Sequence, residues 1–382
     1  MINKILKNNN FKISLILAIL AFSIFFIHNI YNPYLNEKLD DEDSIPWIME
    51  GITRATLGKF FDIQYFSHRN VNINYSPFQL MFWYYAWVNF GEEPYLWHFL
   101  CNFIHLINTI IVFFLANKFI KNKLFSFLAA LSFAVFFLNF NTLKWVASGI
   151  TWGLTAFFML TTFLSIIEYF KTKKIFFYIL SLLLFFSGTF VKEITVFSVP
   201  ILFAYYLILQ RKKELKFIKT DLFIIPYIIL SLPIILITII RPRMIPLAAA
   251  GSGFDLSIGA FYRLIDYINF LITIIPVSFN IELLTSAFSL SLFFVLIYFG
   301  LKNKNLLFLT VWLLLLVSTP IFLNFNYVYN SSRYLYLPSM VWFILLYYIV
   351  SNIKKMKARI IASFFLVNYT IVFNLFLILT GK

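Results

Sequence analysis

The sequence is poor in charged residues and contains a single cysteine. Asp, Glu, Lys and Arg make up only 12% of the 382 residues, whereas a soluble globular domain has about 25%. Apolar residues reach 61%, which is more than a water-soluble body of this size could hide. This composition excludes a soluble enzyme, a disordered chain and a DNA-binding domain, and it predicts that most of the chain lies in lipid. The lone Cys101 excludes an intrachain disulfide and a cysteine-based metal site.

Motifs of several enzyme classes are also missing. The chain has no glycine-rich phosphate loop ending in Lys-Ser or Lys-Thr, no HExxH helix and no GxSxG turn. ATP-driven transport, metal-dependent proteolysis and serine hydrolysis are therefore not indicated. No cofactor is predicted. A divalent cation could bind the acidic residues near position 41, but no companion ligands with a recognisable spacing support it.

Long apolar runs recur along the chain. The hydrocarbon core of a bilayer is about 30 Å thick, so a helix crosses it with about 20 apolar residues. The candidate spans are 11–30, 95–116, 124–140, 146–168, 175–191, 194–210, 221–240, 284–300, 306–323, 337–351 and 360–380. We therefore predict an all-α polytopic membrane protein of about 11 transmembrane helices. It forms one membrane-embedded domain over residues 1–382, with extracytoplasmic loops at 31–94, 241–283 and 324–336.

Two of these loops contain amphipathic stretches. Residues 78–90 include Trp83 and Trp87, and because Trp and Tyr favour the headgroup level, this stretch is predicted to lie on the membrane rather than across it. Residues 241–301 must cross the membrane an odd number of times if the basic clusters are to share one side. We therefore interpret residues 261–276 as an interfacial or re-entrant helix.

The basic residues predict the orientation of the chain. A net charge of +15 would suggest a nucleic-acid partner in a soluble protein, but in a polytopic membrane protein Lys and Arg mark the cytoplasmic loops. Lys4, Lys7 and Lys12 place the N-terminus in the cytoplasm. Alternation then places the basic clusters at 118–123, 171–174, 211–219, 302–304 and 354–359 on the same side. Short loops and the lack of appended domains favour a bacterial plasma membrane, with the active site outside.

Four acids follow the first predicted span, in the sequence LDDEDSIPW at residues 39–47. Crowded carboxylates raise one another's pKa, and burial raises it further, which suits a group that takes a proton from a hydroxyl nucleophile. The alternative interpretation is a solvated loop whose acids only reflect its position outside the cytoplasm and take part in no chemistry.

Polar residues also occur inside the second predicted span. His98, Asn102 and His105 are spaced at i, i+4 and i+7 and so share one helix face. Polar side chains in a lipid-embedded helix usually face the interior of the bundle. We favour interhelical hydrogen bonds or the wall of a site over a metal site here.

Ionisable residues stand at two further turns on the predicted outer side. Lys192 and Glu193 are adjacent between two spans, and Arg333 with Tyr334 precedes another. An ammonium or a guanidinium group at such a place is suited to holding a phosphate. The alternatives are a local salt bridge that caps a helical hairpin and a snorkelling arginine in an aromatic belt.

Taken in order, these residues resemble the GT-C superfamily of membrane glycosyltransferases, and within it the protein O-mannosyltransferase-like branch. The resemblance covers residues 35–350. Its motifs are the acids Asp40, Asp41 and Glu42; Tyr75-Ser76-Pro77-Phe78; Gly91 and Pro94; His98, Asn102 and His105; Asn139, Asn141, Trp145, Ser148 and Gly149; Lys192, Glu193 and Pro200; and residues 332–339.

The resemblance implies an inverting glycosyltransferase with a polyprenyl- or dolichyl-phosphate sugar as donor. Its base would be Asp41, or else Asp40, with Glu42 in support. Arg333 and Lys192 would bind the lipid phosphate. The remaining substrate-binding candidates are Glu193, His98, Tyr75, Asn102 and Tyr334. The partners implied are the lipid-linked donor, an extracytoplasmic acceptor such as a protein, glycan or lipid, and the bilayer, with no nucleic acid.

Two other functions stay open at this point. A transporter or flippase of lipid-linked sugars would also have many helices with polar residues inside them. A catalytically silent membrane scaffold is the third interpretation.

Overall fold

The structure is a computed structural model, and it describes residues 19–25, 61, 76–211, 219–244, 294–321 and 333–366, with short pieces between 263 and 291. Every regular element in these residues is a helix, and no strand occurs among them. The predicted acidic residues Asp40, Asp41 and Glu42 lie outside the described residues, and so does Tyr75. Most of the predicted loops at 241–283 and 324–336 lies outside them too.

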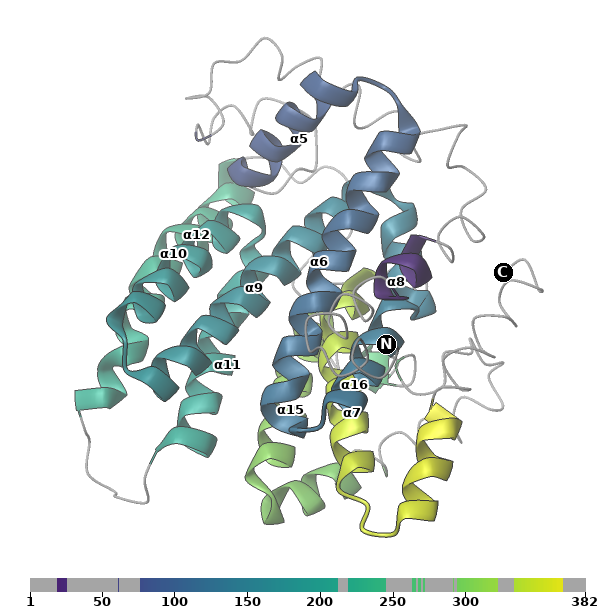
Figure 1. Cartoon of the computed structure of the whole chain (residues 1–382). Coiled ribbons are helices and arrows are strands. Elements are labelled where there is room, and N and C mark those ends of the chain that lie inside the picture. The colour runs from purple at the N-terminus through teal and green to yellow at the C-terminus, as the bar shows by residue number, and fades with distance from the viewer. Residues whose placement is uncertain are drawn as a thin grey trace.

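Several helices are long and apolar enough to cross a membrane. In the described part of the chain they are α6 (Pro94–Ile120), α9 (Val146–Thr172) and the segments Glu193–Gln210 and Arg333–Ser351. The apolar helices α10 (Ile175–Val191), α12 (Ile225–Met244) and α15 (Lys304–Ile321) pack around them (Figure 1). The chain is thus consistent with a helical membrane protein, and the predicted total number of spans remains a prediction.

Two of the predicted spans are interrupted. The run at 124–140 forms α7 (Lys123–Ala134) and α8 (Phe137–Lys144), which meet at 45°. The run at 194–210 begins as a 3₁₀ turn, η2 (Glu193–Phe197), continues as α11 (Ser198–Tyr205) and ends in a π-helical turn, η3 (Tyr206–Gln210). Pro200 accounts for part of this break, because it has no N–H to donate to the carbonyl four residues before it.

Small residues let α6 and α9 approach closely. A Cβ added at Gly149 would lie 3.0 Å from the Sγ of Cys101, and one added at Gly153 would lie 2.7 Å from a methyl group of Ile104. In lipid, where helices gain no hydrophobic energy by meeting, such contacts supply the packing that holds them together. The pair α6 and α9 is therefore the scaffold on which the other helices are placed.

Lysines end both of these long helices. Lys121 follows α6 with φ 55°, and Lys173 follows α9 with φ 59°, so each occupies the left-handed region in which glycine is usual. Both helices have 27 residues and are about 40 Å long, more than the thickness of a hydrocarbon core. Each lysine thus stands at the edge of a membrane span.

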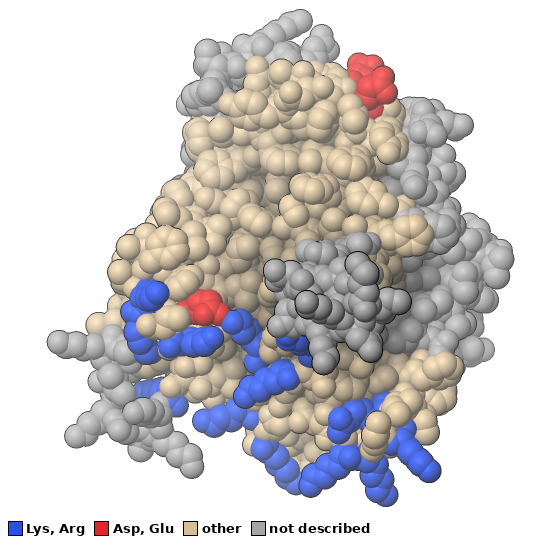
Figure 2. All heavy atoms as spheres, in the orientation of Figure 1, with Lys and Arg blue, Asp and Glu red and all other residues tan. Residues whose placement is uncertain are grey.

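The basic segments gather at one end of the molecule, the lower end in Figure 2. Two contacts fix this arrangement: Lys118 near the end of α6 pairs with Glu168 near the end of α9, and Tyr348 near the end of α16 (Tyr336–Ser351) donates to Asn303 at the start of α15. The cations at this end are Lys118, Lys121, Lys123, Lys171, Lys173, Lys174, Lys302, Lys304, Lys354, Lys355, Lys357 and Arg359. We call this the basic end.

Helix α5 (Pro77–Phe90) lies at the opposite end (Figure 1). It corresponds to the predicted amphipathic stretch and, with 14 residues, is about 21 Å long, which is too short to cross a bilayer. Gly91 ends it with φ 57°, and the Gly91 carbonyl accepts a 2.9 Å hydrogen bond from the indole of Trp97 on α6. This bond ties the end of α5 to the start of the first long span.

Candidate functional site

Two cations distant in the sequence meet around the start of α9. The Nζ of Lys192 lies 5.2 Å from the ring centroid of Trp152. The Cζ of Arg333 lies 5.3 Å from the ring centroid of Trp145 and 5.6 Å from that of Tyr334. The rings of Trp152 and Tyr334 close the group with centroids 5.0 Å apart, edge to face. We call these five residues the cation–aromatic cluster.

Local structure explains the position of each member. Trp145 is the extended residue between α8 and α9, and Trp152 lies in the second turn of α9. Lys192 is the extended residue between α10 and η2, and the hydroxyl of Thr195 closes this junction with a 2.9 Å bond to the carbonyl of Gly188. Arg333 and Tyr334 form a 3₁₀ turn that leads directly into α16.

The cluster also includes an acid at its edge. The Glu193 carboxylate and the Arg333 guanidinium both interact electrostatically with the hydroxyl of Tyr334. Lys192, Glu193 and Arg333 are all partly buried, Trp152 is buried and Trp145 is exposed. A cation over an aromatic ring gains about 0.5–2 kcal/mol from the ring face, and this contact uses none of its N–H donors. Both cations are thus held in place with donors left for an anion.

The cluster lies near the opposite end of α9 from the basic end. Nineteen residues separate Trp152 from Lys171, which corresponds to about 28 Å along a helix. This distance is close to the thickness of a hydrocarbon core. Lys192 and Arg333 are therefore set apart from the basic clusters that the sequence places in the cytoplasm.

The polar face of α6 is buried, as the sequence predicts. His98, Asn102 and His105 are all at most 2% exposed. His105 makes interhelical hydrogen bonds with both ring nitrogens, at 2.7 Å to the hydroxyl of Tyr336 and at 3.1 Å to the carbonyl of Ala134. The predicted interhelical bonding is thus confirmed for His105.

Of the seven substrate-binding candidates, the structure brings four together, places two on the neighbouring helix α6 and does not describe Tyr75. Lys192, Glu193, Arg333 and Tyr334 meet in or beside the cluster. His98 and Asn102 belong to α6, whereas the cluster is assembled from α9, the end of α10 and the turn before α16. The Oδ1 of Asn102 has no hydrogen-bond partner among the described residues.

Sequence reasoning missed Trp152. Trp145 belongs to one of the family motifs, but neither tryptophan was predicted as a site residue. The available signal is a second tryptophan only seven residues after Trp145, near the same end of the predicted span. Asn108 on α6 and Tyr336 on α16, which bond to each other, were missed as well, and Tyr336 also bonds to His105.

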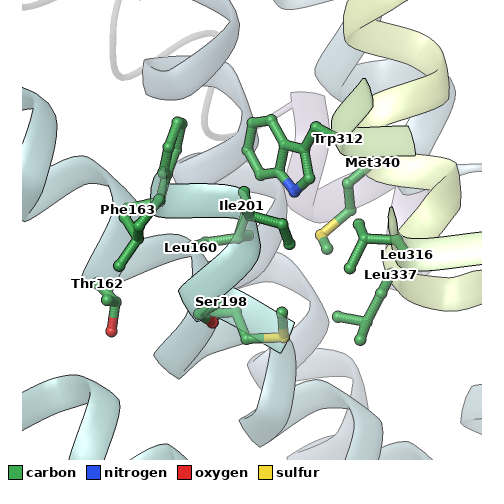
Figure 3. A pocket seen from close by; sticks show the side chains of 11 residues that line it. Leu160, Thr162, Phe163, Ser198, Ile201, Trp312, Leu316, Leu337 and Met340 are labelled. Atoms are coloured by element: carbon green, nitrogen blue, oxygen red, sulfur yellow. The ribbon is translucent and has the colours of Figure 1, made fainter. Parts of the chain in front are cut away.

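The enclosed cavity between four of the helices is too small for a lipid-linked sugar. The cavity in Figure 3 lies between α9, α11, α15 and α16, and Phe163, Ile201, Trp312 and Met340 are among its largely apolar lining residues. Its volume is ≈10 Å³, about enough for one water molecule. This cavity is a packing feature, and the candidate site is the partly exposed cluster.

Metal ligands and known relatives give no further assignment. Within the described ranges, no three His, Cys, Asp or Glu side chains are grouped so that they could hold a metal ion. No model of a known protein family matches the chain, and no curated protein is significantly similar to it.

Proposed function

We propose that the chain is an inverting glycosyltransferase that moves a sugar from a polyprenyl phosphate to an extracytoplasmic acceptor. The observation that carries the proposal is the meeting of Lys192 and Arg333 around Trp145 and Trp152, from positions 141 residues apart in the sequence. Two partly buried cations beside one acid form a site suited to a phosphate group.

The chemistry of the cluster suits a phosphate leaving group. When the acceptor oxygen attacks the anomeric carbon, the bond from that carbon to the phosphate oxygen breaks and its electron pair stays on the lipid phosphate. The Arg333 guanidinium can bind two phosphate oxygens at once, and the Lys192 ammonium adds a point charge. Cations that are already in place stabilise this growing charge without reorganisation.

The proton of the acceptor hydroxyl would go to Asp41, with Asp40 as the other candidate and Glu42 in support. These acids belong to the loop that the sequence places on the outer side, the side on which we also place Lys192 and Arg333. Tyr75, His98 and Asn102 stay candidates for the substrate-facing wall. The acceptor would be a protein, glycan or lipid, and the site would open to the bilayer from which the donor enters.

The test measures sugar release from a panel of radiolabelled polyprenyl-phosphate sugars by the purified chain in lipid. We expect one donor to be used, with activity lost in Asp41→Asn and reduced at least tenfold in Arg333→Gln and in Lys192→Gln. Lys302→Gln at the basic end is the matched control and should behave as wild type.

Two outcomes would overturn the proposal. Transfer that is unchanged in Arg333→Gln and Lys192→Gln would remove the cluster from the function. Movement of labelled donor across vesicle membranes, without transfer of its sugar to any acceptor, would identify the chain as a transporter of lipid-linked sugars.

A further inference from the structure

A buried hydrogen-bond network lies beside the cluster. The amide nitrogen of Asn108 on α6 donates to the hydroxyl of Tyr336 at 3.2 Å and to the carbonyl of Gly153 at 2.8 Å. The Tyr336 hydroxyl also bonds to His105 at 2.7 Å. His105, Asn108 and Tyr336 are all completely buried.

The donors and acceptors in this network fit one arrangement. The carbonyl of Ala134 can only accept, so the Nε2 of His105 carries a proton and donates to it. A charged imidazole would be costly at this depth, so the ring is neutral and its Nδ1 accepts from the hydroxyl of Tyr336. That hydroxyl in turn accepts from Asn108, whose two amide protons are then both used. The Tyr336 hydroxyl is therefore fixed from both sides.

The network binds the two chain segments that carry the cluster. Gly153 follows Trp152 directly, and Tyr336 stands two residues after Tyr334 and three after Arg333. One Asn108 amide thus bridges α9 and α16 next to the 5.0 Å contact between Trp152 and Tyr334. The turn with Arg333 continues into α16 without a break, so a shift of Tyr336 would move Arg333 relative to Trp145.

We infer that Tyr336 is a positioning residue: through His105 and Asn108, its hydroxyl sets the place of Arg333 over Trp145 and of Tyr334 against Trp152. The placement is a property of the fold, whereas its effect on phosphate binding rests on the proposed function.

The test compares Tyr336→Phe with Tyr347→Phe. Both tyrosines are completely buried on α16, and the hydroxyl of Tyr347 also makes one buried hydrogen bond, at 3.0 Å to Ser132. Tyr347 lies 11 residues further along the helix, about 16 Å from Tyr336. The two changes remove the same group from the same helix, near the cluster and far from it.

Two measurements separate positioning from stability. In a Cys101→Ala background, cysteines at 145 and 333 are joined by a short bifunctional thiol reagent, and the rate reports the distance between α9 and the turn before α16. In the chain without added cysteines, the affinity for polyprenyl phosphate is measured in lipid nanodiscs, together with the melting temperature.

We expect Tyr336→Phe to slow cross-linking several-fold and to weaken binding, while Tyr347→Phe lowers the melting temperature alone. Asn108→Leu removes only the hydrogen bonds to Gly153 and Tyr336 and should slow cross-linking as well. It replaces Tyr336→Phe in the test if that variant does not fold. Equal cross-linking rates in all variants would overturn the inference. If cross-linking changes but wild type binds no polyprenyl phosphate, the positioning role stands and the proposed function fails.

Discussion

Trp152 and Tyr334 meet edge to face, with ring centroids 5.0 Å apart, although 182 residues separate them in the sequence. The contact joins the start of α9 to the turn before α16. Lys192 lies over the Trp152 ring and Arg333 lies beside the Tyr334 ring, so one aromatic pair sets the relation between the two cations.

Replacement of Trp145 should weaken anion binding with little effect on stability. Trp145 is 45% exposed, and Trp145→Leu keeps an apolar side chain at this half-buried position while it deletes the ring beneath Arg333. An exposed cation–π contact is worth about 0.5–1 kcal/mol, so we expect the affinity for polyprenyl phosphate to fall about 2- to 5-fold. Binding titration and thermal unfolding check this. A large drop in melting temperature with unchanged binding would contradict it.

Gly153→Ala should destabilise the α6–α9 contact. The added Cβ would stand 2.7 Å from a methyl group of Ile104, and overpacking of this kind costs about 1–3 kcal/mol. Thermal unfolding in detergent measures the loss. Ile104→Ala removes the obstructing methyl group, so the double variant should be more stable than the sum of the single changes predicts. Strict additivity would show that the two positions do not touch.

The pair Lys118–Glu168 should stabilise the basic end. The two side chains are 32% and 26% exposed, so removal of one partner leaves a half-buried charge without its counterion. We expect Lys118→Met to cost about 1 kcal/mol and Lys118→Met with Glu168→Gln to cost less. Lys121→Gln, at an exposed lysine nearby, is the control for loss of charge alone. A single variant as stable as wild type would argue against the pair.

The two ends of the molecule should react from opposite sides of the membrane. Cysteines at position 145 in the cluster and at position 355 at the basic end are both placed on exposed side chains, while the native Cys101 is buried. In intact cells that express the chain, a membrane-impermeant thiol reagent should label position 145 and spare position 355. Labelling of position 355 before lysis would contradict the predicted orientation.

The sequence predicts where the individual helices lie along the chain better than it predicts how they bend and which helices pack together. The predicted runs at 175–191 and 337–351 match α10 and α16 closely, because an apolar run between charged turns marks a lipid-embedded helix. The break at residues 135 and 136 was not predicted, since apolar residues continue through it without interruption from 133 to 138. A hydropathy pattern does not reveal a bend within an apolar run.

For the candidate site, the residue types were predictable but their meeting was not. Lys192 and Arg333 stand out because cations at the predicted outer end of a span are unusual. Lys192 lies over Trp152 and Arg333 lies over Trp145, and the close approach of α6 to Gly149 and Gly153 fixes the start of α9 between them. Periodicity places residues on one face of one helix and does not tell which helix that face meets.

The lysines that end α6 and α9 have a consequence for the insertion of the chain. A left-handed backbone costs a lysine about 1–2 kcal/mol relative to glycine, so Lys121 and Lys173 are not the most stable choices for these two turns. What glycine would lack is the charge that retains a loop in the cytoplasm during synthesis. If these turns face the cytoplasm, as the sequence predicts, Lys121→Gly and Lys173→Gly would give a more stable fold and a nascent chain that is more easily inserted in the opposite orientation.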